Sequence, residues 1–312
     1  MRTASLRSLA ALATALAAAA ACTTRSGDDA AGDSANASLA SNTTHEASFQ
    51  GDFKGPLGVQ LWSFRKEAEK DPAAMLTMTR QMGFTHVETA GLYGMTPQQF
   101  ADAIKAAGLQ VASMHVGYDE LRDSMPKVIS TAKTLGAKYV GLAWYPHDDK
   151  KGFTEADAKK AVADFNKFGR ALRDSGLTFF YHTHGYEPVK SGNGTLLDYM
   201  ITQTDPDLVK IEMDVLWTYL PGVDPAGLIR KYPGRVRLMH IKDMKPGVAR
   251  GSLAGGIPDS SKAVIGEGQV NWSEVMAAAQ KDGLEYYFLE DETTDPVANA
   301  PKSFAYLERL KY

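Results

Sequence analysis

The chain has 312 residues, of which 44% are hydrophobic, and its 34 basic and 37 acidic side chains give a formal net charge of −3. This balance, without a long basic run, argues against a surface built to bind nucleic-acid phosphates, and we expect no nucleic-acid partner. The single cysteine, Cys22, excludes an intramolecular disulfide, so any metal ligands must be His, Asp or Glu.

The first residues are typical of an export signal. Arg2 and Arg7 form a short basic region, and residues 9–21 form an apolar stretch too short for an ordinary transmembrane helix. Cys22 directly follows three alanines, as in a bacterial lipoprotein signal, although Ala19 stands where leucine is usual. We expect residues 1–22 to be a signal peptide with Cys22 as the lipidated residue, and a periplasmic protein that meets the membrane only through this lipid. The alternative is an ordinary secretory signal.

Residues 23–53 are rich in Ser, Thr, Ala, Asn, Asp and Gly. Such a composition buries too little apolar surface to fold, so we predict a flexible linker in which His45 is solvated. The remaining residues, 54–312, match the usual size of a single eight-unit barrel.

Short apolar runs alternate with helical patterns through residues 54–312. We predict strands at residues 57–62, 84–88, 109–115, 138–143, 177–182, 208–214, 236–241 and 285–290. We predict helices at about 71–82, 98–107, 121–135, 155–175, 196–203, 224–231, 272–281 and, last, one ending near 310.

The order of these elements predicts the fold. Alternating strands and helices indicate a parallel sheet, and eight units indicate closure into a (β/α)8 TIM barrel. A doubly wound open sheet is the alternative, but no Gly-x-Gly-x-x-Gly follows the first strand.

Four consecutive predicted strands end in side chains that bind metals. His182 and His184 are two residues apart, so on a strand they point to the same side. Asp214, His240 and Glu290 end or interrupt the next three strands. Parallel barrels place their active sites at these C-terminal strand ends, so we predict one divalent cation there: Mn, Zn, Co, Mg or Fe. Taken singly, each residue has a plain alternative as a core histidine, a helix cap or a surface acid.

Further polar and aromatic residues are predicted around the same mouth. Aromatic faces with amide or carboxylate groups suit a sugar, so we predict substrate contacts from Gln60, Trp62, Glu88, His115, Trp217 and Glu267. Residues 247–262 are rich in Gly, Ser and Ala, and we predict a mobile lid there.

These segments resemble the xylose-isomerase-like barrels, the family of sugar phosphate isomerases and epimerases related to endonuclease IV. The resemblance covers residues 57–312 and rests on GVQLW at 58–62, YHTHGYE at 181–187, DVLW at 214–217, HIKD at 240–243 and GEG at 266–268. It implies a metal held by His182, Asp214, His240 and Glu290. His182 stands where the family usually has Glu, so His184 and Glu187 are alternative ligands from this strand.

The resemblance also implies proton removal beside a carbonyl of a small carbohydrate. Glu290 would be one member of the acid–base pair, and His184, Glu187 or Lys242 the other; Lys242 could instead stabilise an oxyanion. Because the protein is expected to be exported, we expect a non-phosphorylated sugar or keto-sugar and an isomerase or epimerase. The alternatives are a lyase or hydratase of 3-keto-glycosides and a non-catalytic sugar-binding lipoprotein. The sequence gives no oligomeric state.

Overall fold

The structure, a computed structural model, describes residues 44–148 and 150–312. The predicted signal peptide with Cys22, and the linker up to residue 43, lie outside the described residues. Eight parallel strands close into a barrel in the order β1-β12-β9-β8-β5-β4-β3-β2, which confirms the predicted TIM barrel and excludes an open sheet. The strands are β1 Leu57–Gln60, β2 His86–Thr89, β3 Gln110–His115, β4 Tyr139–Leu142, β5 Thr178–His182, β8 Val209–Asp214, β9 Val236–Ile241 and β12 Tyr286–Leu289.

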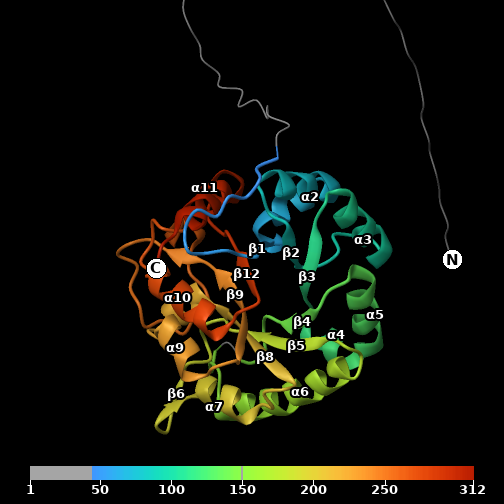
Figure 1. Cartoon of the computed structure of the whole chain (residues 1–312). Helices are drawn as coiled ribbons and strands as arrows, with labels where there is room; N and C mark the ends of the chain where they lie inside the picture. The colour runs from blue at the N-terminus through green and yellow to red at the C-terminus, as the bar shows by residue number, and fades with distance from the viewer. Residues whose placement is uncertain (1–43, 149) are drawn as a thin grey trace, which may run out of the picture. The chain divides into compact units, whose positions relative to one another are not determined.

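A ring of helices surrounds the strands (Figure 1). It contains α2 Pro72–Gln81, α3 Pro97–Ala106, α4 Tyr118–Asp123, α5 Met125–Leu135, α6 Glu155–Arg173, α7 Leu196–Gln203, α9 Pro225–Lys231, α10 Trp272–Asp282 and α11 Pro296–Arg309. The single helix predicted at 121–135 is split at Ser124, because Pro126 has no N–H to continue the hydrogen bonds of the preceding helix and instead lies in the first turn of α5.

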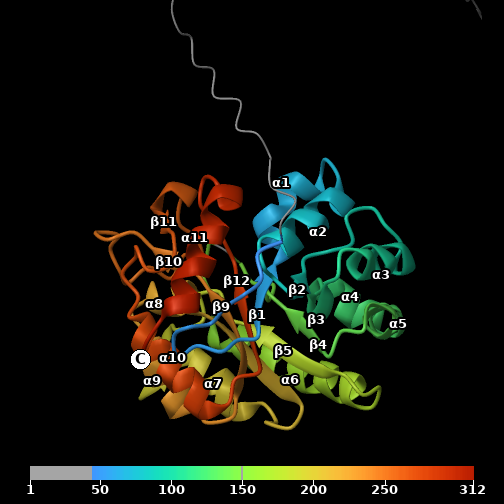
Figure 2. The same cartoon turned by 45° about the horizontal axis from the view of Figure 1, so that its top comes forward.

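Several short elements at the strand ends were not predicted. They are η1 Leu61–Phe64, α1 Arg65–Ala68, α8 Val215–Tyr219, the hairpin of β6 Lys190–Ser191 with β7 Gly194–Thr195, and the hairpin of β10 Asp243–Met244 with β11 Lys262–Ala263. Strand β1 ends early because the Gln60 side chain accepts a hydrogen bond from Trp62 N at 3.1 Å and starts η1. Trp62 therefore lies on η1 and not on the first strand. Figure 2 shows α1, β10 and β11 at the same end of the barrel.

Residues 45–53 pack against the barrel, so the prediction of a flexible linker is wrong for this segment, although His45 is exposed as predicted. Phe53 is buried and contacts Tyr287 edge to face, with ring centroids 5.0 Å apart. His45 Nε2 lies 3.0 Å from Glu308 Oε1, and Gly51 N donates to the Glu308 carbonyl at 2.8 Å. The two phenylalanines in this segment, at positions 49 and 53, supply the apolar surface that the earlier linker residues lack.

The interior of the barrel is apolar toward its N-terminal end and polar toward its C-terminal end. Phe180, Leu238 and Phe288 lie in one buried apolar cluster. Each of the three is followed two residues later by His182, His240 or Glu290, and side chains two apart on a strand share a face. The apolar layer thus supports a polar layer at the mouth. In the described part of the chain, no helix is both long enough and apolar enough to span a membrane.

Candidate active site

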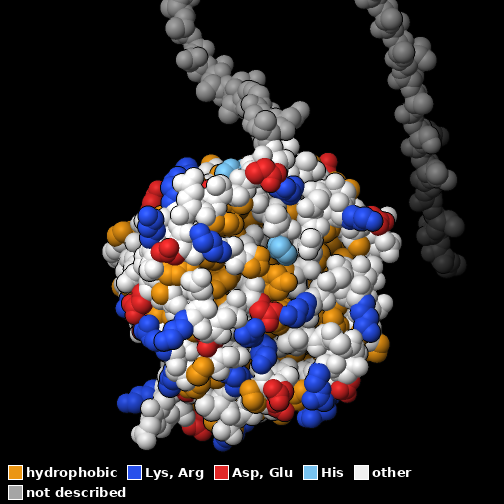
Figure 3. Space-filling view, viewed as in Figure 1, with side chains coloured by type: hydrophobic (Ala, Val, Ile, Leu, Met, Phe, Trp, Pro, Cys, Tyr) orange, Lys and Arg blue, Asp and Glu red, His pale blue; other side chains and the backbone are white. Residues whose placement is uncertain are grey.

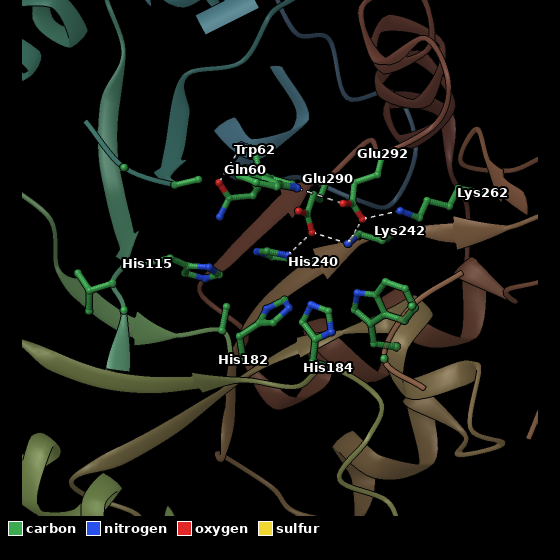
Figure 4. A pocket seen from close by; sticks show the side chains of 18 of the residues that line it. Gln60, Trp62, His115, His182, His184, His240, Lys242, Lys262, Glu290 and Glu292 are labelled. Carbon is green, nitrogen blue, oxygen red and sulfur yellow. Dashed lines mark hydrogen bonds and ion pairs between the residues drawn. The ribbon is translucent and has the colours of Figure 1, made fainter. Parts of the chain in front are cut away.

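A cavity of about 600 Å³ lies at the C-terminal ends of the strands. Nine of the predicted site residues line it, namely Gln60, Trp62, His115, His182, His184, Trp217, His240, Lys242 and Glu290. Asp214 is fully buried directly beside them. In Figure 4, the two histidines of the β5 end lie on one wall of this cavity, and Lys242, Glu290 and Glu292 lie on the opposite wall.

Three of the four predicted metal ligands meet at one point. Asp214, His240 and Glu290 each offer a ligand atom within 4.8 Å of the others. Asp214 caps α8 by accepting from Trp217 N through Oδ1 at 2.9 Å, so the helix-cap alternative is also correct for this residue. Its other oxygen, Oδ2, is buried and accepts no hydrogen bond from the described residues, but the Lys242 ammonium lies 3.2 Å away, so this oxygen already faces a positive charge, as it would in a metal site. These residues therefore fit a metal ion.

His182 belongs to a second group of close ligand atoms, with His115, Glu212 and His240, and one of its nitrogens also approaches the first group. Its Nε2 lies 3.9 Å from Asp214 Oδ2, the same distance that separates His240 Nδ1 from that oxygen. Two carboxylate oxygens and two imidazole nitrogens suit a divalent transition metal or Mg²⁺.

Carboxylates behind these histidines hold their remaining ring nitrogens. His182 Nδ1 lies 3.0 Å from Glu212 Oε2, and His240 Nε2 lies 2.6 Å from Glu88 Oε1. A carboxylate that accepts the N–H of a ligand histidine fixes its tautomer and its ring orientation. We infer from these partners that the β5 ligand is His182 and that His184 has another role.

The electrostatic surroundings favour the cation-binding form of His182 and Glu290, whereas a metal would have to displace a proton from His240. Burial lowers the pKa of His182 well below its usual value, so this imidazole is neutral. Burial opposes ionisation of Glu290, but the positive charges of Lys242 and His240 bring its pKa well below the ordinary range. Burial raises the pKa of Asp214 to about 6 against the opposing effect of Lys242. The pKa of His240, which burial alone would lower, is raised well above its usual value by Glu212, Glu88 and Glu290.

Lys242 joins the carboxylates on its wall of the cavity. Its Nζ lies 3.2 Å from Asp214 Oδ2, 2.6 Å from Glu290 Oε2 and 2.8 Å from Glu292 Oε2. Burial would lower the pKa of Lys242, but these three carboxylates raise it well above its usual value. The ammonium is therefore charged and adjacent to the metal donors, where it can stabilise an oxyanion.

His184 is a histidine of the cavity wall that is both uncharged and, within the described chain, without a partner at one ring nitrogen. Burial, reinforced by the charge of Lys242, lowers its pKa to about 4, so it is neutral near pH 7. Its ring stacks on Trp217, with centroids 5.1 Å apart and planes 16° apart. Its Nδ1 is buried without a hydrogen-bond partner among the described residues. A neutral, unpaired imidazole facing a cavity is suited to act as a general base.

Three predicted site residues do not reach the cavity. Glu88 is fully buried beneath it and accepts from Gln60 Nε2 at 2.7 Å as well as from His240, so it cannot contact a substrate. Glu187 is fully buried and accepts from Tyr181 Oη at 2.7 Å and from His184 N at 2.8 Å, so it orients the loop that presents His184.

The third of these, Glu267, is exposed on the protein surface and is not among the cavity-lining residues. The glycines on either side of it leave no room for side chains against Tyr306 and Asp243. They serve close packing of the loop and do not bring its backbone to a ligand.

Three site residues were missed from the sequence. Glu212 contacts His115, His182 and His240 at 2.8 to 3.2 Å, and Glu292 and Lys262 line the cavity. Glu212 lies two residues before Asp214, and Glu292 two after Glu290, so the spacing that linked His182 with His184 could have found both. Lys262 carried no such signal, because the β10–β11 hairpin brings it to the mouth from the long loop.

Residues 76–310 match the family described as xylose isomerase-like TIM barrel. The chain belongs to this family. Among its relatives is an inosose dehydratase of Lacticaseibacillus casei, 24% identical over 254 residues that cover 74% of this chain and 84% of the relative. These relatives are enzymes that act on small carbohydrates.

Solved structures show the same barrel. A sugar phosphate isomerase/epimerase from Parabacteroides distasonis has a TM-score of 0.65 and 25% identity, covering 80% of this chain and 96% of its own. A family member from Mycobacterium smegmatis in complex with magnesium has a TM-score of 0.62 and 16% identity, covering 82% and 96%. The 3-keto-D-glucoside 4-epimerase of E. coli has a TM-score of 0.59 and 16% identity, covering 81% and 99%.

Proposed function

We propose that this family member is a metal-dependent lyase that acts on a non-phosphorylated keto-sugar by removing the proton beside its carbonyl. One observation carries the proposal: His184 lines the cavity as a neutral base with an unpaired ring nitrogen, while Glu290 and Glu292 on the opposite wall are ionised and paired with Lys242 or Lys262. The other lining carboxylate, Glu120, lies 3.9 Å from Lys127. One base acting on one face suits elimination. Epimerisation, the outcome we favoured from the sequence, requires a second proton donor on the opposite face.

The side chains divide the work as follows. His184 removes the proton from the carbon beside the ketone, and Lys242 stabilises the enolate oxygen that forms. A divalent cation held by His182, Asp214, His240 and Glu290 would supply Lewis-acid polarisation of the ketone. When the ketone re-forms, a carbon–carbon double bond forms and the bond to the oxygen substituent one carbon further on breaks. That oxygen leaves with the bonding electrons and takes up a proton, so no oxidant or reductant is consumed.

The charges in the cavity support a substrate without a phosphate. Among the described lining residues, Glu290 and Glu292 neutralise the two lysines, Lys242 and Lys262. His115 and His240, whose pKa values are raised, are paired with the buried Glu88 and Glu212. A phosphoryl group would therefore meet ionised carboxylates without a free cation to pair with it.

Epimerisation remains the second candidate, because Glu290 and Glu292 lie across the cavity from His184 (Figure 4). A carboxylate on that side could return the proton to the opposite face of the same carbon.

The two outcomes are separated by incubating purified protein with methyl 3-keto-glucoside in D₂O. The lyase releases methanol and leaves an unsaturated ketone. An epimerase releases no methanol and gives a deuterated diastereomer, a result that would overturn the lyase. Prior removal of metal with a chelator, checked by elemental analysis, should abolish turnover, and adding back Mn²⁺, Zn²⁺ or Mg²⁺ should restore it.

We also propose that the protein works after export, tethered by a lipid on Cys22. The support is the sequence of residues 1–22 alone. Labelled palmitate should enter the wild type in cells but not a Cys22→Ala variant, and the variant should move from the membrane fraction to the soluble fraction. Equal labelling of both would refute the tether.

A further inference from the structure

A second cavity, hereafter the annex, opens beside the candidate pocket. Its volume is about 310 Å³, and it shares Gly91, His115, Val116 and Glu120 with that pocket. Because the two spaces have these walls in common, a molecule seated at the metal donors can extend into the annex. The mechanism above does not use this space.

The annex differs chemically from the pocket that it adjoins. Its walls come from the loop after β2, the end of β3 and the inward face of α5, and the apolar side chains on them are Leu92, Met95, Pro97, Met114, Val116 and Val128. Methionine side chains adapt to flat ligands and make favourable sulfur–aromatic contacts. Glu120 and Lys127, 3.9 Å apart, provide charged groups on its wall.

An elimination reaction produces a leaving group that this cavity could bind. A departing water molecule needs no apolar pocket, whereas a departing alcohol or phenol must be held somewhere. We propose that the annex binds the aglycone of a 3-keto-glycoside whose sugar ring lies in the candidate pocket, so that the substrate is a glycoside with an aromatic or bulky apolar aglycone. This inference rests on the proposed function and names its substrate class.

In a 3-keto-glycoside, this β-elimination involves C1, C2 and C3 of the sugar ring. His184 takes the proton at C2, the enolate collapses to the C3 ketone, and the C1–C2 double bond forms as the C1–O bond breaks. The aglycone oxygen keeps the electron pair and receives the proton that His184 removed, passed on through water, which gives the free alcohol and restores the neutral imidazole. The products are an unsaturated keto-sugar and the aglycone.

The test compares methyl and 2-phenylethyl 3-keto-glucosides, whose alkoxide leaving groups are similarly basic. The wild type should have a kcat/KM about tenfold higher for the 2-phenylethyl compound, the scale expected for burying a phenyl group. Met95→Trp, and independently Leu92→Trp, fill the annex and should remove this preference while leaving the methyl compound within about twofold. Leu253→Trp, on an exposed position of the loop before β11, is the bulk-matched control and should keep the preference.

Two results would refute aglycone binding in the annex. One is an equal kcat/KM of the wild type for both glycosides, and the other is an equal loss of kcat/KM for both glycosides in the Trp variants. Binding of the unreactive 2-phenylethyl and methyl glucosides, measured by calorimetry, separates this failure from failure of the proposed function. Suppose that no keto-glycoside is turned over, but the wild type binds the phenylethyl glucoside more tightly than the methyl glucoside and Met95→Trp does not. The proposed lyase activity is then wrong, and the proposed aglycone binding in the annex is supported. Equal binding of both compounds refutes the annex even if elimination occurs.

Discussion

Two histidines at the end of β5, His182 on the strand and His184 two residues later, have different chemistry because their partners differ. Glu212 holds the Nδ1 of His182, so the Nε2 of this histidine faces Asp214. His184 has its backbone held by Glu187 and its ring against Trp217, and no described residue pairs with its Nδ1. Spacing places both rings on one side of the strand, but only their neighbours distinguish a ligand from a base.

Matched substitutions at the two positions should separate the roles. His184→Asn should lower kcat at least 100-fold, within the range for loss of a general base, while the metal content stays at the wild-type level. His182→Asn should lower the bound metal, and Mn²⁺ or Zn²⁺ added in excess should rescue it in part. Elemental analysis and steady-state kinetics on both variants check this. Loss of metal in His184→Asn with retention in His182→Asn would exchange the two assignments.

At the scale of elements, the sequence is sufficient where the buried positions of a strand are apolar and a capping box marks the start of a helix. Strand β9 and helix α7 have the predicted bounds, 236–241 and 196–203, because continuous apolar runs and a Thr195 capping box mark them. The short elements at the mouth have no such periodicity. Their positions depend on contacts between segments distant in sequence, such as Asp243 with Ala263 in the β10–β11 hairpin.

That hairpin positions the loop that we predicted to be a lid. Gly255, Gly256 and Ile257 line the candidate pocket, as expected for a loop lying over the mouth. Lys262 ties the end of the loop to the barrel through Glu292 Oε2 at 3.0 Å, and also pairs with Asp259 at 3.0 Å. Loops that close over an active site commonly combine such an attachment with a glycine-rich span.

Removing this attachment should loosen the lid. Lys262→Met keeps the length of the side chain but loses both ion pairs, so protease cleavage within residues 245–261 should become several-fold faster and KM should rise about tenfold. Lys245→Met, on an exposed position at the start of the same loop, should leave both quantities unchanged. An unchanged cleavage rate in Lys262→Met would show that the ion pairs do not hold the loop.

The two ends of the barrel differ in how their carboxylates are paired. At the mouth, carboxylates exceed cations and favour a bound metal. At the N-terminal end, Glu285, which precedes β12, accepts from Arg237 Nη2 on β9 at 2.5 Å and pairs with Lys138, which precedes β4. Figure 3 shows acidic and basic side chains next to one another near the middle of the face drawn, with hydrophobic side chains around them. One carboxylate thus links three strands at the end of the barrel opposite the active site.

This cluster should make stability depend on pH in one direction. Burial would raise the pKa of Glu285, but hydrogen bonds from Arg237, Lys138 and Tyr139 lower it from 4.5 to about 2. A carboxyl group with a lowered folded-state pKa stabilises the fold above its unfolded-state pKa, and this contribution is lost as the pH falls from 4.5 to 2. Because Glu285 is partly exposed, we expect Glu285→Gln to lower the free energy of unfolding by about 1 kcal/mol at pH 7. Urea titrations from pH 7 downward should show the difference from wild type shrinking below pH 4.5 toward zero near pH 2. As a control, Glu274→Gln removes an exposed ion pair with Arg230 and should change the free energy of unfolding by less than about 0.5 kcal/mol. If the loss of stability in Glu285→Gln stayed constant with pH, Glu285 would stabilise the barrel through packing and not through its charge.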